Sequence, residues 1–281
     1  MGAGLDHRAV VVVGAAGGLG SAAARRLSRE GARLVLADLD EAALARLAAE
    51  LRPVAGFVAW VRVDVADWDS VAALARDAES AIGPVDAVVN CAAVLSPGRL
   101  DTLCAEALRN EVEVNLVGTM FLTRAFLPAF RARCSGHFVH FASLGGIAPM
   151  PRGAAYSATK FGVRGFCLAM DLELRGTGVR VSALSPDSAA TPLLAAEAAG
   201  RGSPLSFSGR ILHPDEVAAA VVRTLRRPVP EVMVPAGRGW LTRLVNLSPR
   251  VMAAIYPWLS RDGERGRHSF LRRLAAQLPA H

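Results

Sequence analysis

Short apolar runs alternate along the 281-residue chain with longer stretches in which apolar residues recur at helical spacing. The short runs predict seven β-strands, within residues 9–15, 32–38, 56–65, 85–93, 136–143, 179–186 and 231–236. The longer stretches predict helices at residues 20–31, 40–51, 68–83, 102–133, 154–176 and 213–228. Strands that alternate with crossover helices predict an α/β fold, in which a doubly wound parallel sheet carries helices on both faces.

The apolar pattern continues beyond the last predicted strand, from residue 238 to residue 281. One helical stripe comprises Trp240, Leu241, Leu244, Val245 and Leu247, and a second, after Pro249, comprises Val251, Met252, Ile255, Trp258 and Leu259. Eight arginines and two carboxylates share this segment, so it carries almost all of the chain's net charge of +7. Such a tail can lie on a bilayer surface, pack over a cleft of its own domain or contact a second subunit.

Composition narrows the class of protein. Hydrophobic residues make up 52% of the chain, which indicates a packed core. No apolar run reaches the roughly 18 residues of a membrane-spanning helix, and the N-terminal pattern is not that of a signal peptide. The cysteines have no paired spacing, so we expect reduced, buried thiols in a cytoplasmic protein; they are Cys91, Cys104, Cys134 and Cys167. Because the basic excess lies in the tail, we expect no nucleic-acid-binding face, and we expect no metal site.

A glycine-rich turn follows the first predicted strand and precedes a helix. Gly14, Gly18 and Gly20 form the pattern G-x-x-x-G-x-G, with Leu19 inside it. Glycines let the backbone approach a pyrophosphate, and a helix N-terminus offers free N–H groups. Glycine-rich turns can also serve packing alone, but this position between strand and helix predicts a dinucleotide site and a Rossmann-type fold.

Polar residues end three of the predicted strands. Asp38 ends the second, Asp64 and Val65 end the third, and Asn90 ends the fourth. A carboxylate at Asp38 can bind both ribose hydroxyls of adenosine and would repel a 2′-phosphate, which favours NAD over NADP. Asp64 with the next backbone amide can read an adenine edge. Alternatively, Asp38 caps the following helix and Asp64 is a solvated loop carboxylate.

Lys160 is the only lysine among 32 basic residues, and Tyr156, one of two tyrosines, lies four positions before it. Positions four apart share a helix face. A phenol has a pKa of about 10, and a neighbouring ammonium lowers it. The bulkier arginine is a poor replacement for a lysine that also has to reach a ribose. The pair therefore predicts acid–base chemistry, in which Tyr156 exchanges a proton with an oxygen while a hydride moves to or from its carbon.

Together these motifs resemble the short-chain dehydrogenases/reductases over about residues 8–236. The matching features, in family order and spacing, are the glycine turn, Asp64-Val65, Asn90, Asn115 in "NLVG", Ser143, "YSATK" from Tyr156 to Lys160, and P-x-x-x-x-T from Pro186 to Thr191. The resemblance implies a dinucleotide-binding and catalytic domain at residues 1–237, with residues 238–281 as a basic amphipathic tail. The tail is also similar, more weakly, to those of family members that act on retinoids, steroids or other lipophilic alcohols.

The resemblance also implies residue roles. Tyr156 would be the acid–base residue, Lys160 would tune it and hold the ribose, and Ser143 would orient the substrate oxygen. Asn115 would hold a water that links Lys160 to solvent. The glycine turn, the polar strand ends, Pro186 and Thr191 would bind the cofactor. Taken alone, the Ser143 hydroxyl could cap a turn and the Asn115 amide could satisfy helix backbone.

Three positions depart from the family pattern. Val13 stands where the family usually has Thr, and Ala93 where it usually has Gly. Asp187 stands where Gly usually follows Pro186, which places a carboxylate near the expected nicotinamide end.

The sequence thus predicts an NAD(H)-dependent oxidoreductase that interconverts a lipophilic secondary alcohol and its ketone. One alternative is a 3-oxoacyl-thioester reductase, whose anionic carrier would meet the tail arginines. An alternative of another class is a catalytically idle NAD-sensing regulator, against which the intact set Asn115, Ser143, Tyr156 and Lys160 counts. We expect a cytoplasmic homo-oligomer, with membrane contact through the tail left open.

Overall fold

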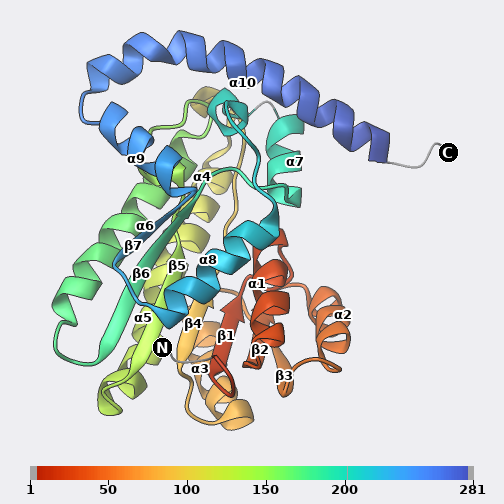
Figure 1. Cartoon of the computed structure of the whole chain (residues 1–281), viewed down its shortest axis with the longest axis vertical. Helices are drawn as coiled ribbons and strands as arrows, with labels where there is room; N and C mark the ends of the chain where they lie inside the picture. Colours follow the sequence, from red (N-terminus) through yellow and green to blue (C-terminus); the bar gives the residue numbers. More distant parts are fainter. Residues whose placement is uncertain (1–4, 201, 278–281) are drawn as a thin grey trace.

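The computed structural model describes residues 5–200 and 202–277. Its seven strands are all parallel and form one sheet in the order β3-β2-β1-β4-β5-β6-β7 (Figure 1). The strands are β1 (Ala9–Val13), β2 (Arg33–Asp38), β3 (Phe57–Arg62), β4 (Ala87–Asn90), β5 (Gly136–Phe141), β6 (Val179–Pro186) and β7 (Glu231–Val234). The chain reverses its winding direction between β1 and β4, which is the doubly wound Rossmann-type arrangement expected from the sequence.

Helices cover both faces of the sheet. One face packs against α1 (Gly18–Arg29), α2 (Glu41–Leu51) and α8 (Pro214–Arg226). The other packs against α3 (Trp68–Ile82), α5 (Gly118–Ala132) and α6 (Ala154–Glu173). Because both faces are covered, the central strands are continuous apolar runs, and all five residues of β1 are fully buried.

The helices differ from the prediction in two places. The helical region expected over residues 102–133 is divided into η1 (Leu100–Thr102), α4 (Ala105–Val112), a π-helical turn η2 (Glu113–Val117) and α5. A helix that the sequence analysis did not predict, α7 (Pro192–Ala199), follows β6, with the side chain of Thr191 accepting the Leu194 N–H at its start. Helix α7 is short and mostly apolar, so it has little of the amphipathic spacing that identifies longer helices.

The tail folds into two helices, α9 (Ala236–Val245) and α10 (Pro249–Gln277). Helix α10 crosses above α7 at the carboxyl end of the sheet (Figure 1) and packs on the turn η4 (Pro204–Phe207). The rings of Phe207 and Phe270 lie 5.8 Å apart, centroid to centroid. Gly263 and Gly266 let α10 come close, because a Cβ at either position would collide with the η4 backbone. The predicted apolar-faced tail helices are confirmed for the described residues.

No helix in residues 5–200 and 202–277 is long and apolar enough to cross a membrane. All four cysteines are free. Cys167 is buried as expected and Cys91 is half-buried, but the expectation is wrong for Cys104 and Cys134, which are exposed. These two lie at helix ends, before α4 and after α5, where the backbone meets solvent.

Strand β5 carries two buried histidines, His137 and His140. The His137 Nε2 lies 2.9 Å from the Ser182 hydroxyl, and the His140 Nε2 lies 2.9 Å from the Thr123 hydroxyl. Neither Nδ1 has a hydrogen-bond partner among the described residues. Burial lowers the pKa of each imidazole to about 3, so both are neutral in the folded protein near pH 7.

This burial predicts acid sensitivity. Between pH 6.5 and about 3, the unfolded chain binds protons at both imidazoles and the folded chain does not. The free energy of unfolding should therefore fall as the pH falls, by about 1.4 kcal/mol per pH unit for each histidine. Urea unfolding of His137→Gln and His140→Gln should show a shallower pH slope than wild type, whereas His268→Gln, at an exposed position, is the control. Equal slopes in all four proteins would contradict this prediction.

Candidate active site

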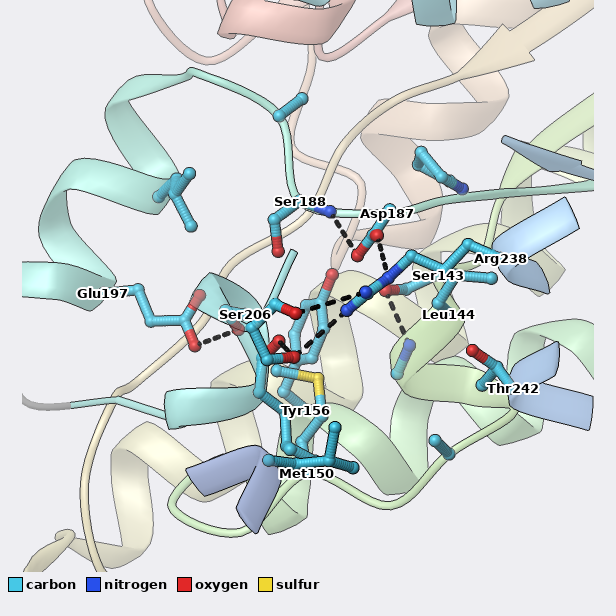
Figure 2. Close-up of a pocket in the computed structure, with 18 of the residues that line it drawn as sticks. Ser143, Leu144, Met150, Tyr156, Asp187, Ser188, Glu197, Ser206, Arg238 and Thr242 are labelled. Carbon is cyan, nitrogen blue, oxygen red and sulfur yellow. Dashed lines mark hydrogen bonds and ion pairs between the residues drawn. The ribbon is translucent and has the colours of Figure 1, made fainter. Parts of the chain in front are cut away.

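A cavity of about 340 Å³ lies at the carboxyl end of the sheet (Figure 2). The core contributes Ser143, Tyr156 and the segment after β6 to its wall, and the tail contributes residues of α9 and α10. Most of the lining is apolar, and its large apolar side chains include Leu95, Leu144, Met150, Leu193, Leu205, Leu241, Met252, Ile255, Trp258 and Leu259. The tail therefore forms one wall of the cavity, which is one of the three placements that the sequence left open.

Ser143 and Tyr156 meet in this cavity. Ser143 directly follows β5, and its Oγ accepts the Gly145 N–H at 3.0 Å, which orients the hydroxyl. This is the turn-capping role that the sequence left open, and it does not exclude a second contact. Tyr156 lies in the first turn of α6 and projects into the same space. Both hydroxyl-bearing side chains line the cavity, and the Ser143 hydroxyl is near enough to lower the pKa of the Tyr156 phenol, so we describe the two hydroxyls as a pair.

Lys160 lies one helical turn beyond Tyr156 and is 1% exposed. Its Nζ donates to the carbonyl oxygen of Phe141 at 2.8 Å and lies 5.6 Å from the centroid of the Tyr156 ring. Burial lowers the pKa of Lys160 to about 8. The ammonium form is therefore only modestly favoured at neutral pH, and the carbonyl of Phe141 fixes where it lies.

The sequence led us to expect a lowered Tyr156 pKa beside Lys160, but in this structure the net pKa of the phenol is raised. Burial is the largest influence and raises the pKa of the phenol well above its usual value, while the Ser143 hydroxyl lowers it. The negative charges of Glu197 and Glu111 also raise it. Helical spacing placed the ammonium correctly but could not reveal how much water the cavity wall excludes. A protonated phenol at Tyr156 is able to donate a hydrogen bond to an oxygen placed in the cavity.

Asn115 lies in the π-helical turn η2 and is 1% exposed. Its Oδ1 accepts the Val94 N–H at 2.8 Å, and its Nδ2 donates to the Val94 carbonyl at 2.9 Å and to the Thr159 hydroxyl at 3.1 Å. Thr159 in turn donates to the Tyr156 carbonyl at 2.7 Å. The amide thus joins the loop after β4 to the turn of α6 that carries Tyr156 and Lys160.

The glycine turn has the geometry of an anion cradle. Gly14 has a φ of 73°, and a Cβ there would collide with the backbone of Ala92. A Cβ at Gly18 would lie 2.8 Å from the Cγ2 of Thr191, so the two segments of the family pattern touch. No side chain caps the N-terminus of α1, and its first turn has no acidic residue. Its N–H groups and dipole therefore suit a pyrophosphate, and the residues present fit a dinucleotide.

Asp38 and Asn90 end their strands beside this turn, whereas Asp64 and Val65, predicted to end the third strand, lie beyond β3, which ends at Arg62. Asp38 Oδ2 accepts the Ala16 N–H at 2.9 Å, which places the carboxylate against the glycine turn. Asp64 Oδ1 accepts the Ala66 N–H at 2.9 Å, and Val65, which follows it, is 6% exposed. Asn90 is buried, donates to the Thr119 hydroxyl and accepts the Ala92 N–H. Asp38 therefore has Oδ2 committed to the glycine turn, and its Oδ1 accepts the Asp40 N–H at 3.3 Å, while Asn90 chiefly shapes the strand end.

Two features of the cavity were not assigned from the sequence. Asp187, the departure from the family pattern, forms an ion pair with Arg238 of the tail. Arg238 also donates to the Ser208 carbonyl at 3.3 Å and to its hydroxyl at 3.1 Å. Glu197, on α7, is a second buried carboxyl group in the lining. The isolated carboxylate in the apolar stretch "TPLLAAEAAG" was the available signal for Glu197.

Residues 8–202 match the family model described as short chain dehydrogenase. The chain belongs to this family. It is therefore a dehydrogenase/reductase, an oxidoreductase that acts on alcohols or ketones with a nicotinamide cofactor. Among its relatives, 1-deoxy-11-beta-hydroxypentalenate dehydrogenase of Streptomyces exfoliatus is 39% identical over 202 residues, which cover 71% of this chain and 74% of that protein.

Solved structures of the family agree in fold. A short-chain dehydrogenase/reductase from Burkholderia phymatum in complex with NAD is 29% identical and has a TM-score of 0.79, covering 87% of this chain and 94% of that one. A variant of actinorhodin polyketide ketoreductase with NADPH is 30% identical and has a TM-score of 0.75, covering 85% of this chain and 99% of that one. The two similar structures thus hold different nicotinamide cofactors.

The geometry predicts separate effects for the two central side chains. Tyr156→Phe should reduce kcat by at least a hundredfold, because the proton donor is lost, and should leave the Kd for NADH nearly unchanged. Lys160→Ala should lose turnover and also weaken NADH binding. Both quantities can be measured by steady-state kinetics and fluorescence titration. Tyr256→Phe, at the only other tyrosine, is the matched control. If Tyr156→Phe keeps a tenth of the wild-type rate, Tyr156 is not the proton donor.

Proposed function

We propose that this enzyme interconverts a lipophilic secondary alcohol and its ketone with NAD(H). The observation that carries the proposal is the Ser143–Tyr156 hydroxyl pair on the wall of a mostly apolar cavity, with Lys160 beneath Tyr156. A hydroxyl pair that can both hold and protonate an oxygen suits a carbonyl or alcohol group, and the apolar wall suits the rest of a greasy molecule.

A bound nicotinamide supplies or accepts the hydride. In the reducing direction the Tyr156 phenol donates its proton to the ketone oxygen, and in the oxidising direction the phenolate takes it back from the alcohol. The Ser143 hydroxyl holds that oxygen next to Tyr156. The Lys160 ammonium stabilises the phenolate that proton transfer leaves behind, and it is near enough to hold a ribose.

Asn115 contributes to this chemistry through position. Its amide is committed to Val94 and Thr159, so its side chain fixes the loop and the helix on either side of Lys160. We also propose that a water near Asn115 links Lys160 to solvent and replenishes its proton. The backbone and surroundings of Asn115 would hold this water, because its side-chain amide is already hydrogen-bonded.

The choice of NAD rests on Asp38. Its carboxylate lies at the end of β2 against the glycine turn, where an adenosine ribose would lie, and it would repel a 2′-phosphate. Gly14, Gly18, Leu19 and Gly20 would hold the pyrophosphate, and Asp64, Val65 and Asn90 would flank the adenosine half. Pro186 and Thr191, which line the cavity, would adjoin the nicotinamide half.

The lipophilic substrate class rests on the cavity wall. The relative from Streptomyces exfoliatus is named for a hydroxyl-bearing pentalenate, which supports a secondary alcohol as the reacting group here. A 3-oxoacyl thioester remains the second enzymatic candidate because arginines line the tail outside the cavity. Membership of an enzyme family weighs against the idle NAD-sensing regulator.

A substrate panel tests the proposal directly. Alicyclic and long-chain secondary alcohols, their ketones and a 3-oxoacyl thioester would be assayed by the absorbance of the reduced nicotinamide, with NAD(H) and NADP(H) side by side. The proposal expects the largest kcat/KM for an apolar alcohol–ketone pair with NAD(H). A larger value for the thioester would move the assignment to the alternative.

Asp38 gives the cofactor prediction. Asp38→Ala should lower the preference for NAD, measured as kcat/KM with NAD divided by kcat/KM with NADP, by about tenfold or more. The reason is that the ribose acceptor and the charge that repels a 2′-phosphate are both lost. Asp40→Ala, at the N-cap of α2 two residues away, should lower stability without changing this ratio. A wild-type preference for NADP would overturn the choice of NAD.

We also propose that the tail contacts an anionic bilayer surface. Leu241 and Trp258 line the cavity and are nevertheless 61% and 68% exposed, so the cavity opens beside an apolar surface. Further exposed apolar side chains of α9 and the following turn adjoin it, at Trp240, Leu244 and Leu247. Exposed tail arginines add an attraction to anionic lipid. A lipophilic substrate could then enter from the bilayer.

Point variants test the membrane contact without removing α10. Leu244→Glu and Leu247→Glu should reduce sedimentation with phosphatidylglycerol-containing vesicles severalfold at low salt, and high salt should reduce wild-type sedimentation too. Leu172→Glu, at an equally exposed position on α6, is the matched control and should behave as wild type. Absence of wild-type sedimentation at low salt would remove the membrane contact and leave the catalytic proposal in place.

The expected homo-oligomer and cytoplasmic location stay predictions. Exposed apolar side chains at Val112, Met120 and Phe161, on α4, α5 and α6, are candidate subunit contacts.

A further inference from the structure

Three charged side chains line the cavity among the described residues: Asp187, Glu197 and Arg238. Two of them neutralise each other, because Arg238 pairs with Asp187 and uses its remaining nitrogens on Ser208. Glu197 forms no ion pair with a residue in 5–200 or 202–277. It is therefore the charged group of the cavity that the proposed alcohol–ketone chemistry leaves unexplained.

Among the described residues, only one of the two carboxyl oxygens of Glu197 has hydrogen-bond partners. Its Oε1 accepts the Ser203 N–H at 3.1 Å and the Ser206 O–H at 2.7 Å, which holds the turn after α7 in place. Its Oε2 has no hydrogen-bond partner among residues 5–200 and 202–277, and it is not among their fully enclosed unpaired atoms. The residue as a whole is 6% exposed and lines the cavity.

Glu197 and Tyr156 share the same low-dielectric space. Figure 2 shows the Glu197 side chain extending from α7 to Ser206, with Tyr156 on the other side of Ser206. The charge of Glu197 is felt at the Tyr156 phenol, whose pKa it raises. A carboxyl group that only organised a turn could be replaced by an amide or hydroxyl at lower desolvation cost. The open oxygen therefore points to a ligand.

The chemistry of the partner follows from the charges. Burial raises the pKa of Glu197 to about 7, so near neutral pH it is present both as an acid and as a carboxylate. A hydroxyl suits both forms, because it can accept from the acid and donate to the carboxylate. A substrate carboxylate would face Glu197 and Asp187 with Arg238 already paired. A substrate ammonium would have to lose its water among apolar side chains.

We propose that Glu197 binds a second hydroxyl of the substrate, at the end remote from the reacting carbon. It would thereby select lipophilic hydroxy ketones and diols that carry an oxygen group at each end. This inference rests on the proposed alcohol–ketone chemistry. It makes Glu197 a specificity residue that contacts substrate and takes no part in hydride or proton transfer.

The test uses methyl ketones of increasing chain length together with their ω-hydroxy and ω-carboxy counterparts, reduced with NADH. At one chain length the wild-type kcat/KM for the hydroxy ketone should exceed that of the parent ketone by about tenfold, the effect of one hydrogen bond to a charged group. The carboxy ketone should fall below the parent. A wild-type enzyme without hydroxyl preference at any length, or one that prefers the carboxylate, overturns the inference.

Variants separate substrate binding from the role in the turn. Glu197→Met should reduce the hydroxyl preference to about one, and Glu197→Gln should leave a reduced preference, since its amide keeps an acceptor for Ser203 and Ser206. Ser206→Ala removes a structural partner of the Glu197 Oε1. It should lower kcat/KM for the hydroxy ketone and for the parent ketone alike, so the hydroxyl preference should be preserved. If Glu197→Met does not fold, the inference is tested by whether Glu197→Gln has a lower hydroxyl preference than wild type.

The outcomes distinguish this inference from the proposed function. Turnover of the parent ketones with an unchanged hydroxyl preference in both Glu197 variants overturns the inference alone. An equal loss of preference in Ser206→Ala and Glu197→Met assigns Glu197 to the turn only, and also overturns it. Absence of turnover with every ketone, with NADH and with NADPH, overturns the proposed function and this inference with it.

Discussion

The site depends on a buried ammonium held at the end of a strand. Lys160 Nζ donates to the carbonyl of Phe141, the last residue of β5, and so ties α6 to the sheet at the point where Ser143 follows. Burying an ammonium is costly, and the lowered pKa of Lys160 expresses that cost. The contact fixes the height of α6 against the sheet and therefore places Tyr156 beside Ser143. Arginine could not make the same contact without displacing the strand end, because its planar head is larger.

The other half of the site is assembled by close approach. Gly18 touches Thr191, which lies 173 positions further along the chain, and Gly14 packs on the loop after β4. These contacts leave no room for side chains, so they bring the N–H groups of α1, the Asp38 carboxylate and the segment after β6 to one edge. Parallel strands make this possible, since their carboxyl ends all face the same way. The cofactor cradle and the proton-transfer residues are thus two sets of contacts on a single sheet edge.

Sequence patterns predicted the parts of this arrangement that follow from local rules. Seven apolar runs predicted seven parallel strands, and the spacing of Tyr156 and Lys160 predicted a shared helix face, because both depend on periodicity alone. The π-helical turn at Asn115 was missed, since it is stabilised by contacts with Val94 and Thr159 that no local pattern contains. The Tyr156 pKa was misjudged for a related reason: spacing locates the nearby charge, whereas burial depends on the tail and on α7. The partner of Asp187 was equally invisible, because Arg238 reaches it only once the tail has folded back.

The division between the family core and the rest of the chain explains where specificity arises. The family model ends at residue 202, and the hydroxyl pair, the lysine and the glycine turn all lie before it. The cavity wall is different: much of it comes from η4, α9 and α10, which lie beyond that match. Arg238 neutralises the carboxylate at Asp187, and α10 seals the far side by packing on η4 through Phe207 and Phe270. In the proposed function the core would therefore determine which bond is made or broken, and the tail, by excluding water and cancelling charge, would determine which molecules can bring that bond to Tyr156.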